Sequence, residues 1–201
     1  MNSSSARAAC IRFKRWGASA TAWVLLLLLI GAEFRPVTAQ PKPAERTEFE
    51  LKAAYLYHFA QFIEWPAEAF TNSQAPIVIG VVGKDPFGKV LDDTVRDKTV
   101  KDRPFVVRRL SGTEGIKDCH IVYVSSSEKP RLPEIIRLLN DESILSVNED
   151  VQFTRLGGVV NFMMENKKVR FEINMAAAEK ARLKLDAQLL RLAKISRHSA
   201  E

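Results

Sequence analysis

Residues 80–88 are the first place where residue types and spacing suggest chemistry, because glycines that follow an apolar strand can cradle a phosphate. Their sequence, GVVGKDPFG, matches neither the dinucleotide-binding pattern nor the P-loop pattern. Asp85 and Pro86 instead favour a strand-to-helix turn in which Asp85 caps the following helix. Anion binding at the start of that helix is the alternative.

The histidine, cysteine and serine residues do not form a metal site or a catalytic set. His58, His120 and His198 lack the short spacings of metal ligands. Cys119 and His120 are neighbours on a predicted strand, where successive side chains point to opposite faces, so they cannot act as nucleophile and base. The serine run 125–127 lacks the G-x-S-x-G elbow. We therefore predict no catalytic residue, no metal and no cofactor.

Polar residues interrupt apolar strands in the last third of the chain, where a buried polar group needs a partner or a function. Glu172 lies between Phe171 and Ile173, and if it faces inward it needs Arg155 or Arg170 as a partner. The residues that we single out in this region are Asn161, Arg170, Glu172 and Asn174. The alternative is that they only tie a hairpin to the last helix, with Asn174 as its cap.

The elements that position these residues begin with a long helix after a short polar linker, residues 40–46. Residues 47–50 have the S/T-x-x-E form of a capping box, and Trp65 and Pro66 end the helix. Apolar residues recur at steps of three and four, so one stripe must be buried. Tyr57 lies on a second face, where it suits an interface or the core equally well.

Beyond residue 76, strand-like and helix-like segments alternate. Strands are predicted at residues 77–82, 105–110, 119–124 and 144–147, and helices at residues 86–95 and 133–139. Residues 158–164 and 169–174 then predict an antiparallel hairpin, followed by helical segments 175–181 and 186–195. The result is a single α/β domain, residues 47–197, with a mixed β-sheet flanked by helices, a C-terminal β-hairpin and helix, and a tail at 198–201.

The first 39 residues have the form of a cleaved secretory signal peptide. Basic residues precede the apolar run 20–32, and residues 37–39 supply small side chains before a cut between Ala39 and Gln40. The run is closed by Glu33 and Arg35 and is short for a bilayer span, which needs about 20 apolar residues. This favours a signal over a retained membrane anchor.

The charge of the chain changes when this segment is set aside. Residues 1–39 hold five of the 30 basic and one of the 24 acidic residues, so the rest carries 25 basic and 23 acidic residues, a net charge of +2. Nucleic-acid binding therefore loses its main support. Cys119 is left without an intrachain partner and without an electropositive setting, so we expect it to be buried and unreactive.

Three separated groups of residues resemble the YfiR-like family. They are residues 51–57 (LKAAYLY) with 62–66 (FIEWP), residues 80–88, and residues 157–162 (GGVVNF) with 170–174 (RFEIN) and 189–193 (LLRLA). The resemblance implies a periplasmic α/β domain, often dimeric. The best-known members of the family restrain a membrane-bound diguanylate cyclase by binding its periplasmic sensor region.

Some motif residues have a purely structural alternative, and two features depart from the family. Gly157 and Gly158 also suit a bulge or turn, and Trp65 also suits the core. The disulfides of some members cannot form here, because Cys119 is the only cysteine after the signal. Arg182 stands where many members have glycine, and a left-handed backbone there would cost about 1 kcal/mol or more.

We expect a periplasmic regulatory binding protein that restrains a membrane-bound diguanylate cyclase, so that its release raises cyclic di-GMP and favours biofilm formation. The expected partner is the periplasmic region of that cyclase or of another membrane sensor, with a homodimer as a further candidate, no nucleic acid, and no membrane span after signal cleavage. The alternative is a periplasmic small-ligand receptor that uses the cleft beyond the strand ends, near residues 83–88. An enzyme has no support beyond the fold class.

Overall fold

The computed structural model describes residues 43–196, with side chains from Glu48 onward, and helix α2 (Pro43–Phe62) is the first of the described elements. The helix begins before the predicted start at Thr47, so residues 43–46 of the predicted linker are helical. Pro43 accounts for the difference, because proline is well suited to the first turn of a helix. The predicted signal peptide, residues 1–39, and the predicted tail lie outside the described residues.

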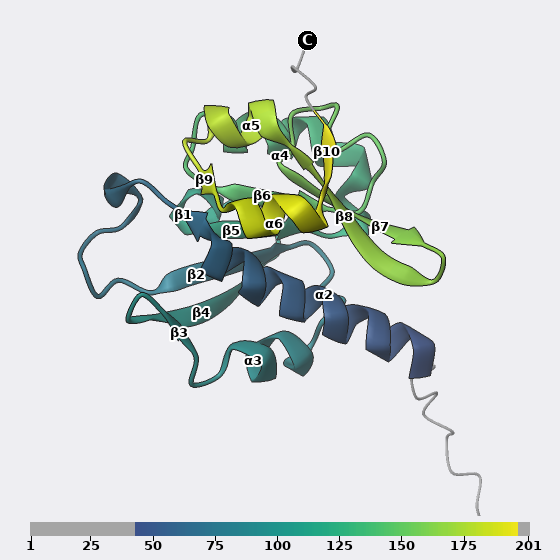
Figure 1. The fold of residues 1–201 in the computed structure, drawn as a ribbon, viewed down its shortest axis with the longest axis horizontal. Coiled ribbons are helices and arrows are strands. Elements are labelled where there is room, and N and C mark those ends of the chain that lie inside the picture. The colour runs from purple at the N-terminus through teal and green to yellow at the C-terminus, as the bar shows by residue number, and fades with distance from the viewer. Residues whose placement is uncertain (1–42, 197–201) are drawn as a thin grey trace, which may run out of the picture. The chain divides into compact units, whose positions relative to one another are not determined.

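Eight strands form one mixed sheet (Figure 1). They are β2 (Ile77–Val82), β3 (Thr99–Val100), β4 (Arg103–Leu110), β5 (Ile121–Val124), β6 (Leu145–Asn148), β7 (Val160–Glu165), β8 (Lys168–Asn174) and β10 (Lys194–Ser196). Their order is β10-β8-β7-β6-β5-β2-β4-β3. The strands β4, β2, β5, β6 and β7 are parallel. Strand β3 is antiparallel to β4 and β8 is antiparallel to β7, whereas β10 is parallel to β8.

The first strand of the sheet lies in its middle, with β4 on one side and β5, β6 and β7 on the other. This is the doubly wound arrangement, in which the connections place helices on both faces. Two helices follow strands in this way, α3 (Lys89–Val95) and α4 (Leu132–Leu139). Short 3-10 helices cover Ala67–Ala69, Ile116–Asp118 and Ser126–Arg131.

Each face of the sheet carries its own apolar core, because successive side chains on a strand point to opposite faces. On one face, Ile79 and Tyr123 pack with α2, α3, α5 (Met175–Lys180) and α6 (Ala187–Leu192). On the other face, Val82 and Val122 pack with α4. Figure 1 views the molecule from the side of α2 and α6. The predicted α/β class, with one mixed sheet between helices, is confirmed.

The predicted hairpin is present as the antiparallel pair β7 and β8. Its turn residues, Asn166 and Lys167, have φ angles of 50° and 61°. Two successive positive φ angles are typical of the type I′ turn, whose twist matches that of the strands. The pairing places Asn161 opposite Glu172 and Phe162 opposite Phe171.

The chain after α5 departs from the predicted pair of helices. Arg182 has a φ of 55°, so the left-handed backbone is kept although the residue is not glycine. Lys184–Leu185 form strand β9, which pairs antiparallel with β1 (Ile63–Glu64) in a separate two-stranded sheet. Within the described residues, no helix is both long and apolar enough to cross a bilayer.

The predicted helix 186–195 is wrong at its end. Helix α6 stops at Leu192, and β10 follows it and pairs with β8 in the register Ile195 to Ile173. Helical periodicity alone does not predict the change from helix to strand after Leu192, because β10 is formed by pairing with β8, from which α5, β9 and α6 separate it in the chain. Asp186 caps α6 as predicted, since its side chain accepts a hydrogen bond from the Gln188 N–H.

Candidate functional site

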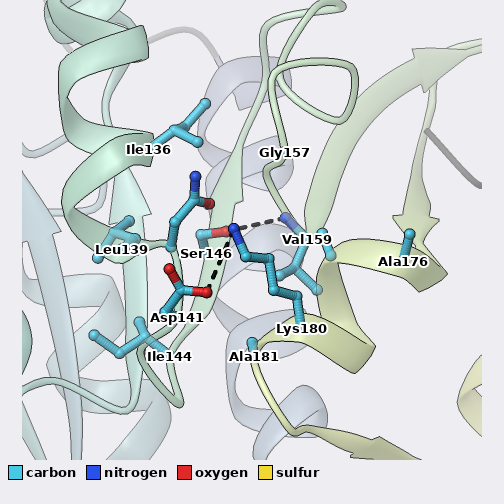
Figure 2. Close-up of a pocket in the computed structure, with 12 residues that line it drawn as sticks. Ile136, Leu139, Asp141, Ile144, Ser146, Gly157, Val159, Ala176, Lys180 and Ala181 are labelled. Carbon is cyan, nitrogen blue, oxygen red and sulfur yellow. Dashed lines mark hydrogen bonds and ion pairs between the residues drawn. The ribbon is translucent and has the colours of Figure 1, made fainter. Parts of the chain in front are cut away.

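A cavity of about 260 Å³ opens between α4 and α5 (Figure 2). Helix α4 contributes Ile136 and Leu139 to its wall, β6 contributes Ser146, and α5 contributes Ala176 and Ala177. Aliphatic side chains of α4 and alanines of α5 share this wall with polar groups, among them Asn140, Asp141 and Lys180. The cavity therefore has an apolar part against the two helices and a polar part beside it.

Gly157 and Gly158 shape the turn that closes one side of this cavity. Gly157 lies in the wall and has a φ of 102°, a conformation that side chains rarely adopt. Gly158 packs directly against the buried ring of Phe153, which a Cβ at this position would overlap. Both glycines of the GGVVNF motif therefore have a structural role. Gly157 is required for its positive φ, and Gly158 is required because the ring of Phe153 lies against its backbone.

Asn174 joins this turn to α5. The side chain is fully buried, and its Oδ1 accepts hydrogen bonds from the N–H groups of Ala176 at 3.1 Å and Ala177 at 3.3 Å. Its Nδ2 donates to the carbonyl of Thr154 at 2.8 Å. Asn174 is therefore the N-cap of α5, as the sequence predicts, and it also fixes residues 151–157 beside the cavity.

The polar groups of the cavity lie at its floor and at its mouth. At the floor, Ser146 Oγ accepts a hydrogen bond of 3.0 Å from the N–H of Val159. At the mouth, Lys180 Nζ lies 3.4 Å from Asp141 Oδ1, and the two side chains are 50% and 77% exposed (Figure 2). An ion pair this exposed adds little stability, so both side chains remain free to move.

A row of polar residues crosses the sheet next to the cavity. Asn148, Asn161, Glu172 and Lys194 occupy matching positions on β6, β7, β8 and β10, and we call them the polar row. Phe162 and its neighbours on β8 pack on the α2 side, so the polar row faces the α4 side. Asn161 is 1% exposed, and its Oδ1 has no hydrogen-bond partner among the described residues.

The pairing expected for Glu172 is not found among the described residues. Glu172 is half-buried, and neither Arg155 nor Arg170 forms an ion pair with it. Both arginines are exposed. The reason is that Glu172 keeps contact with water at the side of the sheet, so its charge does not require a partner. All four residues that we singled out in this region, Asn161, Arg170, Glu172 and Asn174, lie on one face of two adjacent strands.

Tyr57 lies on α2 and Trp65 directly follows β1, and neither residue lines the cavity. The Tyr57 ring packs 5.6 Å from that of Phe105 on β4, and Lys98 Nζ lies 4.4 Å from the centre of the Tyr57 ring. Tyr57 is therefore a half-buried residue at the β4 side of the molecule. Trp65 is also half-buried, and its indole N–H donates to the carbonyl of His120 at 3.3 Å.

Asp85 does not cap the helix that follows it, contrary to the prediction. Helix α3 begins at Lys89, with Gly88 at its N-cap. Asp85 instead accepts a hydrogen bond from the Phe87 N–H at 2.8 Å and another from Arg109 Nε at 3.0 Å. Arg109 also binds Asp92, and its hydrogen bonds hold the pKa of that carboxyl below its usual range. The longer turn thus ties α3 to β4.

The ends of β2 and β5, where the alternative prediction places a ligand cleft, are filled by the chain itself. A Cβ at Gly83 would lie 2.5 Å from Ser127 Oγ and 2.7 Å from Glu128 Cγ. The N–H of Lys84 donates to Ser127 Oγ at 2.9 Å. These contacts occupy the space that a phosphate would need at this turn, so the geometry does not favour the cleft as a ligand site.

Cys119 and His120 are buried, and their surroundings do not activate either side chain for catalysis. Burial raises the pKa of the Cys119 thiol to about 11, so the thiol is protonated at neutral pH. His120 Nδ1 accepts from the N–H of Val78 at 3.0 Å, Nε2 donates to the carbonyl of Ala69 at 3.1 Å, and burial lowers the pKa of the ring. In residues 43–196, no group of three His, Cys, Asp or Glu side chains is placed to hold a metal ion.

Sequence reasoning missed a buried ionic cluster on α2. Lys52 is 2% exposed and bonds to Glu48 at 2.5 Å and to Glu149 at 2.8 Å, and Glu149 also accepts from the hydroxyl of Tyr123. The available signal was that Lys52 lies four residues before the buried Leu56, on the same stripe of the helix. Ser146, Asp141 and Lys180 gave no such signal, because they come together only in the folded chain.

The sheet and its helices define an α/β domain, and its cavity and polar row are features suited to binding. The sequence matches the family described as YfiR/HmsC-like over residues 49–194, and the chain belongs to that family. Membership implies a regulatory protein in the context of cyclic di-GMP signalling. None of the curated proteins matches the sequence.

Solved structures with a similar fold exist. One of them is the crystal structure of a conserved domain protein from Vibrio cholerae O1 biovar El Tor strain N16961, with a TM-score of 0.53 and 11% sequence identity. The match covers 74% of this chain and 60% of that one, so the chain spans less than two thirds of the length of that protein. At this identity the similarity supports the fold alone.

Proposed function

We propose that this protein is a periplasmic regulator that restrains a membrane-bound diguanylate cyclase by binding the periplasmic sensor region of that enzyme. Family membership supports the regulatory role, and the form of the first 39 residues supports export. The restraint works by population shift, because a protein that binds one state of the sensor better than another changes the balance between them.

The observation that carries this proposal is the outer edge of the sheet. Strand β10 is the last strand of the sheet, and in the described chain nothing pairs with its outer side. Exposed side chains lie along this edge on both faces of the sheet. Arg170, Glu172 and Lys194 lie on the α4 side, whereas Met164 and Ile195 lie on the α2 side. This edge surface consists of Met164, Arg170, Glu172, Leu192, Lys194 and Ile195.

The edge surface has the composition of a protein contact. Met164, Leu192 and Ile195 are exposed large apolar side chains, which gain most from being covered by a partner. Arg170 and Glu172 have no ion pair with another described residue, so both charges are available to a partner. Apolar side chains bordered by charged ones are typical of protein interfaces, in which arginine and methionine are enriched.

The first test of the function is deletion of the gene in its native host, followed by measurement of cellular cyclic di-GMP. We expect the level to rise, to return to normal with the intact gene, and to stay high with a version that lacks residues 1–39. An unchanged level after deletion would overturn the proposal that the protein restrains a cyclase. Full restoration by the version without residues 1–39 would instead overturn the periplasmic location.

The second test concerns the edge surface. The double variant Arg170→Glu, Ile195→Asp should no longer recover a membrane protein with a cyclase domain from envelope extracts, and it should not restore the cyclic di-GMP level. The matched control is Lys84→Glu, Val151→Asp, which also replaces one basic and one aliphatic side chain by carboxylates, at exposed positions away from the edge surface. Equal recovery by both variants would show that the partner binds elsewhere.

A further inference from the structure

We propose that the cavity between α4 and α5 binds an uncharged small organic molecule with an apolar body and one hydrogen-bond acceptor. The volume of about 260 Å³ exceeds that of a cavity known to hold benzene in another protein, which is about 150 Å³. The space is therefore large enough for one ring with a short substituent. This inference is independent of the proposed partner and uses residues that the edge surface does not include.

The residues around the cavity keep it open. Ala176, Ala177 and Ala181 of α5 and its flank, together with Gly157, place the smallest side chains where larger aliphatic ones would fill the space. Filling a cavity with apolar side chains commonly stabilises a protein. Stability alone therefore does not explain why this cavity stays unfilled. The polar group at its floor indicates that it binds a ligand.

Ser146 is that group. It is 4% exposed and lies in the wall of the cavity, and its Oγ accepts a hydrogen bond from the N–H of Val159 (Figure 2). Its hydroxyl hydrogen has no acceptor among the hydrogen bonds of the described residues. A serine hydroxyl can donate one bond as well as accept. An acceptor on a bound molecule would complete its hydrogen bonding.

The charges at the cavity favour an uncharged ligand. Asp141 and Lys180 neutralise one another at the mouth, where both are in contact with water. The residues further inside, such as Ile144 and Val159, carry no charge that would balance an ion. A charged group placed beside Ile144 and Val159 would lose its hydration away from both of these ionic side chains, which is unfavourable. An alcohol, ketone or ether on a ring avoids this cost and still reaches Ser146.

The test uses three probes with the same cyclohexyl ring and different charges. They are cyclohexyl methyl ketone, cyclohexylacetate and 2-cyclohexylethylammonium, added to the full-length protein labelled with ¹⁵N. We expect saturable shifts in the amide signals of Gly157, Val159 and Ala176 with the ketone, and binding weaker by about tenfold or more for both ions. No saturable shift with the ketone, or equal binding of an ion, would overturn the proposal.

Two variants locate the binding site. Ala176→Leu fills the cavity without removing a side-chain hydrogen bond, and it should abolish the response to the ketone. The matched control, Ala187→Leu, makes the same change at an exposed position on α6 and should bind the ketone normally. Ser146→Ala should weaken ketone binding, with folding checked by thermal melting because the Val159 N–H loses its acceptor. Normal binding by Ala176→Leu would contradict the proposal, and none of these outcomes depends on cyclic di-GMP.

Discussion

Gly158 allows the ring of Phe153 to lie against the backbone just before β7. Gly158→Ala would force this buried ring to move, and overpacking of this kind costs about 1–3 kcal/mol. We expect the free energy of unfolding, measured by urea denaturation, to fall by that amount. Gly112→Ala is the control, because no atom lies within 4 Å of a Cβ there. A loss equal to that of the control would mean that the ring has room to move.

Cys119 should respond to thiol reagents only when the protein unfolds. Burial raises its pKa from the ordinary value of 9.0 to about 11, so the folded state holds the thiol proton more tightly than the unfolded state does. Its contribution to stability is therefore complete below pH 9 and decreases as the pH rises toward 11. Alkylation at pH 8, read from the Cys119 peptide by mass spectrometry, should be slow in the native protein and fast in urea. Fast native alkylation would contradict the burial.

At the scale of single residues, the sequence predicts those roles that depend on close neighbours in the chain. The caps formed by Asn174 and Asp186 are examples, since each cap bonds to residues two or three positions away. The role of Asp85 was predicted wrongly because Arg109, far along the chain, is its second partner. Ser146 and Lys180 could not be predicted as neighbours of one cavity, because only the packing of α5 beside α4 brings them together.

The junction between α5 and β9 contains backbone strain at Arg182. A left-handed conformation costs a non-glycine residue roughly 1–2 kcal/mol, and glycine removes this cost while adding some flexibility to the unfolded chain. We expect Arg182→Gly to raise the free energy of unfolding by about 0.5–1 kcal/mol in urea denaturation. Lys184→Gly, in strand β9 with an ordinary φ, should lower it by a similar amount. A loss in both variants would mean that the Arg182 side chain stabilises the junction.

At the scale of elements, patterns within a segment predicted the strands of the parallel sheet and the hairpin. Strand β2 and the β7–β8 pair are apolar or alternating runs bounded by turn residues, so their own sequence specifies them. Strands β1, β9 and β10 were not predicted, because two or three residues carry no period and their pairing partners supply the structure. The start of α2 was predicted four residues too late. Both the capping box at Thr47 and the proline at position 43 are signals for the start of a helix, and the prediction followed the capping box.

At the scale of the whole molecule, the two apolar cores share the strands between them, so we expect one cooperative unfolding transition. Leu56→Ala removes a fully buried side chain on the α2 face and should cost about 2–5 kcal/mol. Cys119 lies in the core on the opposite face and reports on that side. We expect Leu56→Ala to lower the midpoint of urea unfolding. The decrease should be the same whether unfolding is followed by circular dichroism or by labelling of Cys119. Midpoints that separate would show that the faces unfold independently.

The pairing of β1 with β9 affects the order in which the chain can assemble. Ile63 and Glu64 follow the first helix, whereas Lys184 and Leu185 come shortly before the end of the described chain. A polypeptide that emerges from a ribosome or a transport channel presents these two pairs of residues at widely separated times. Strand β1, at the end of α2, cannot pair with its partner strand until residues 184 and 185 have arrived, and contacts between such distant residues slow folding. A chaperone therefore has a long interval in which to hold the apolar stripe of this helix.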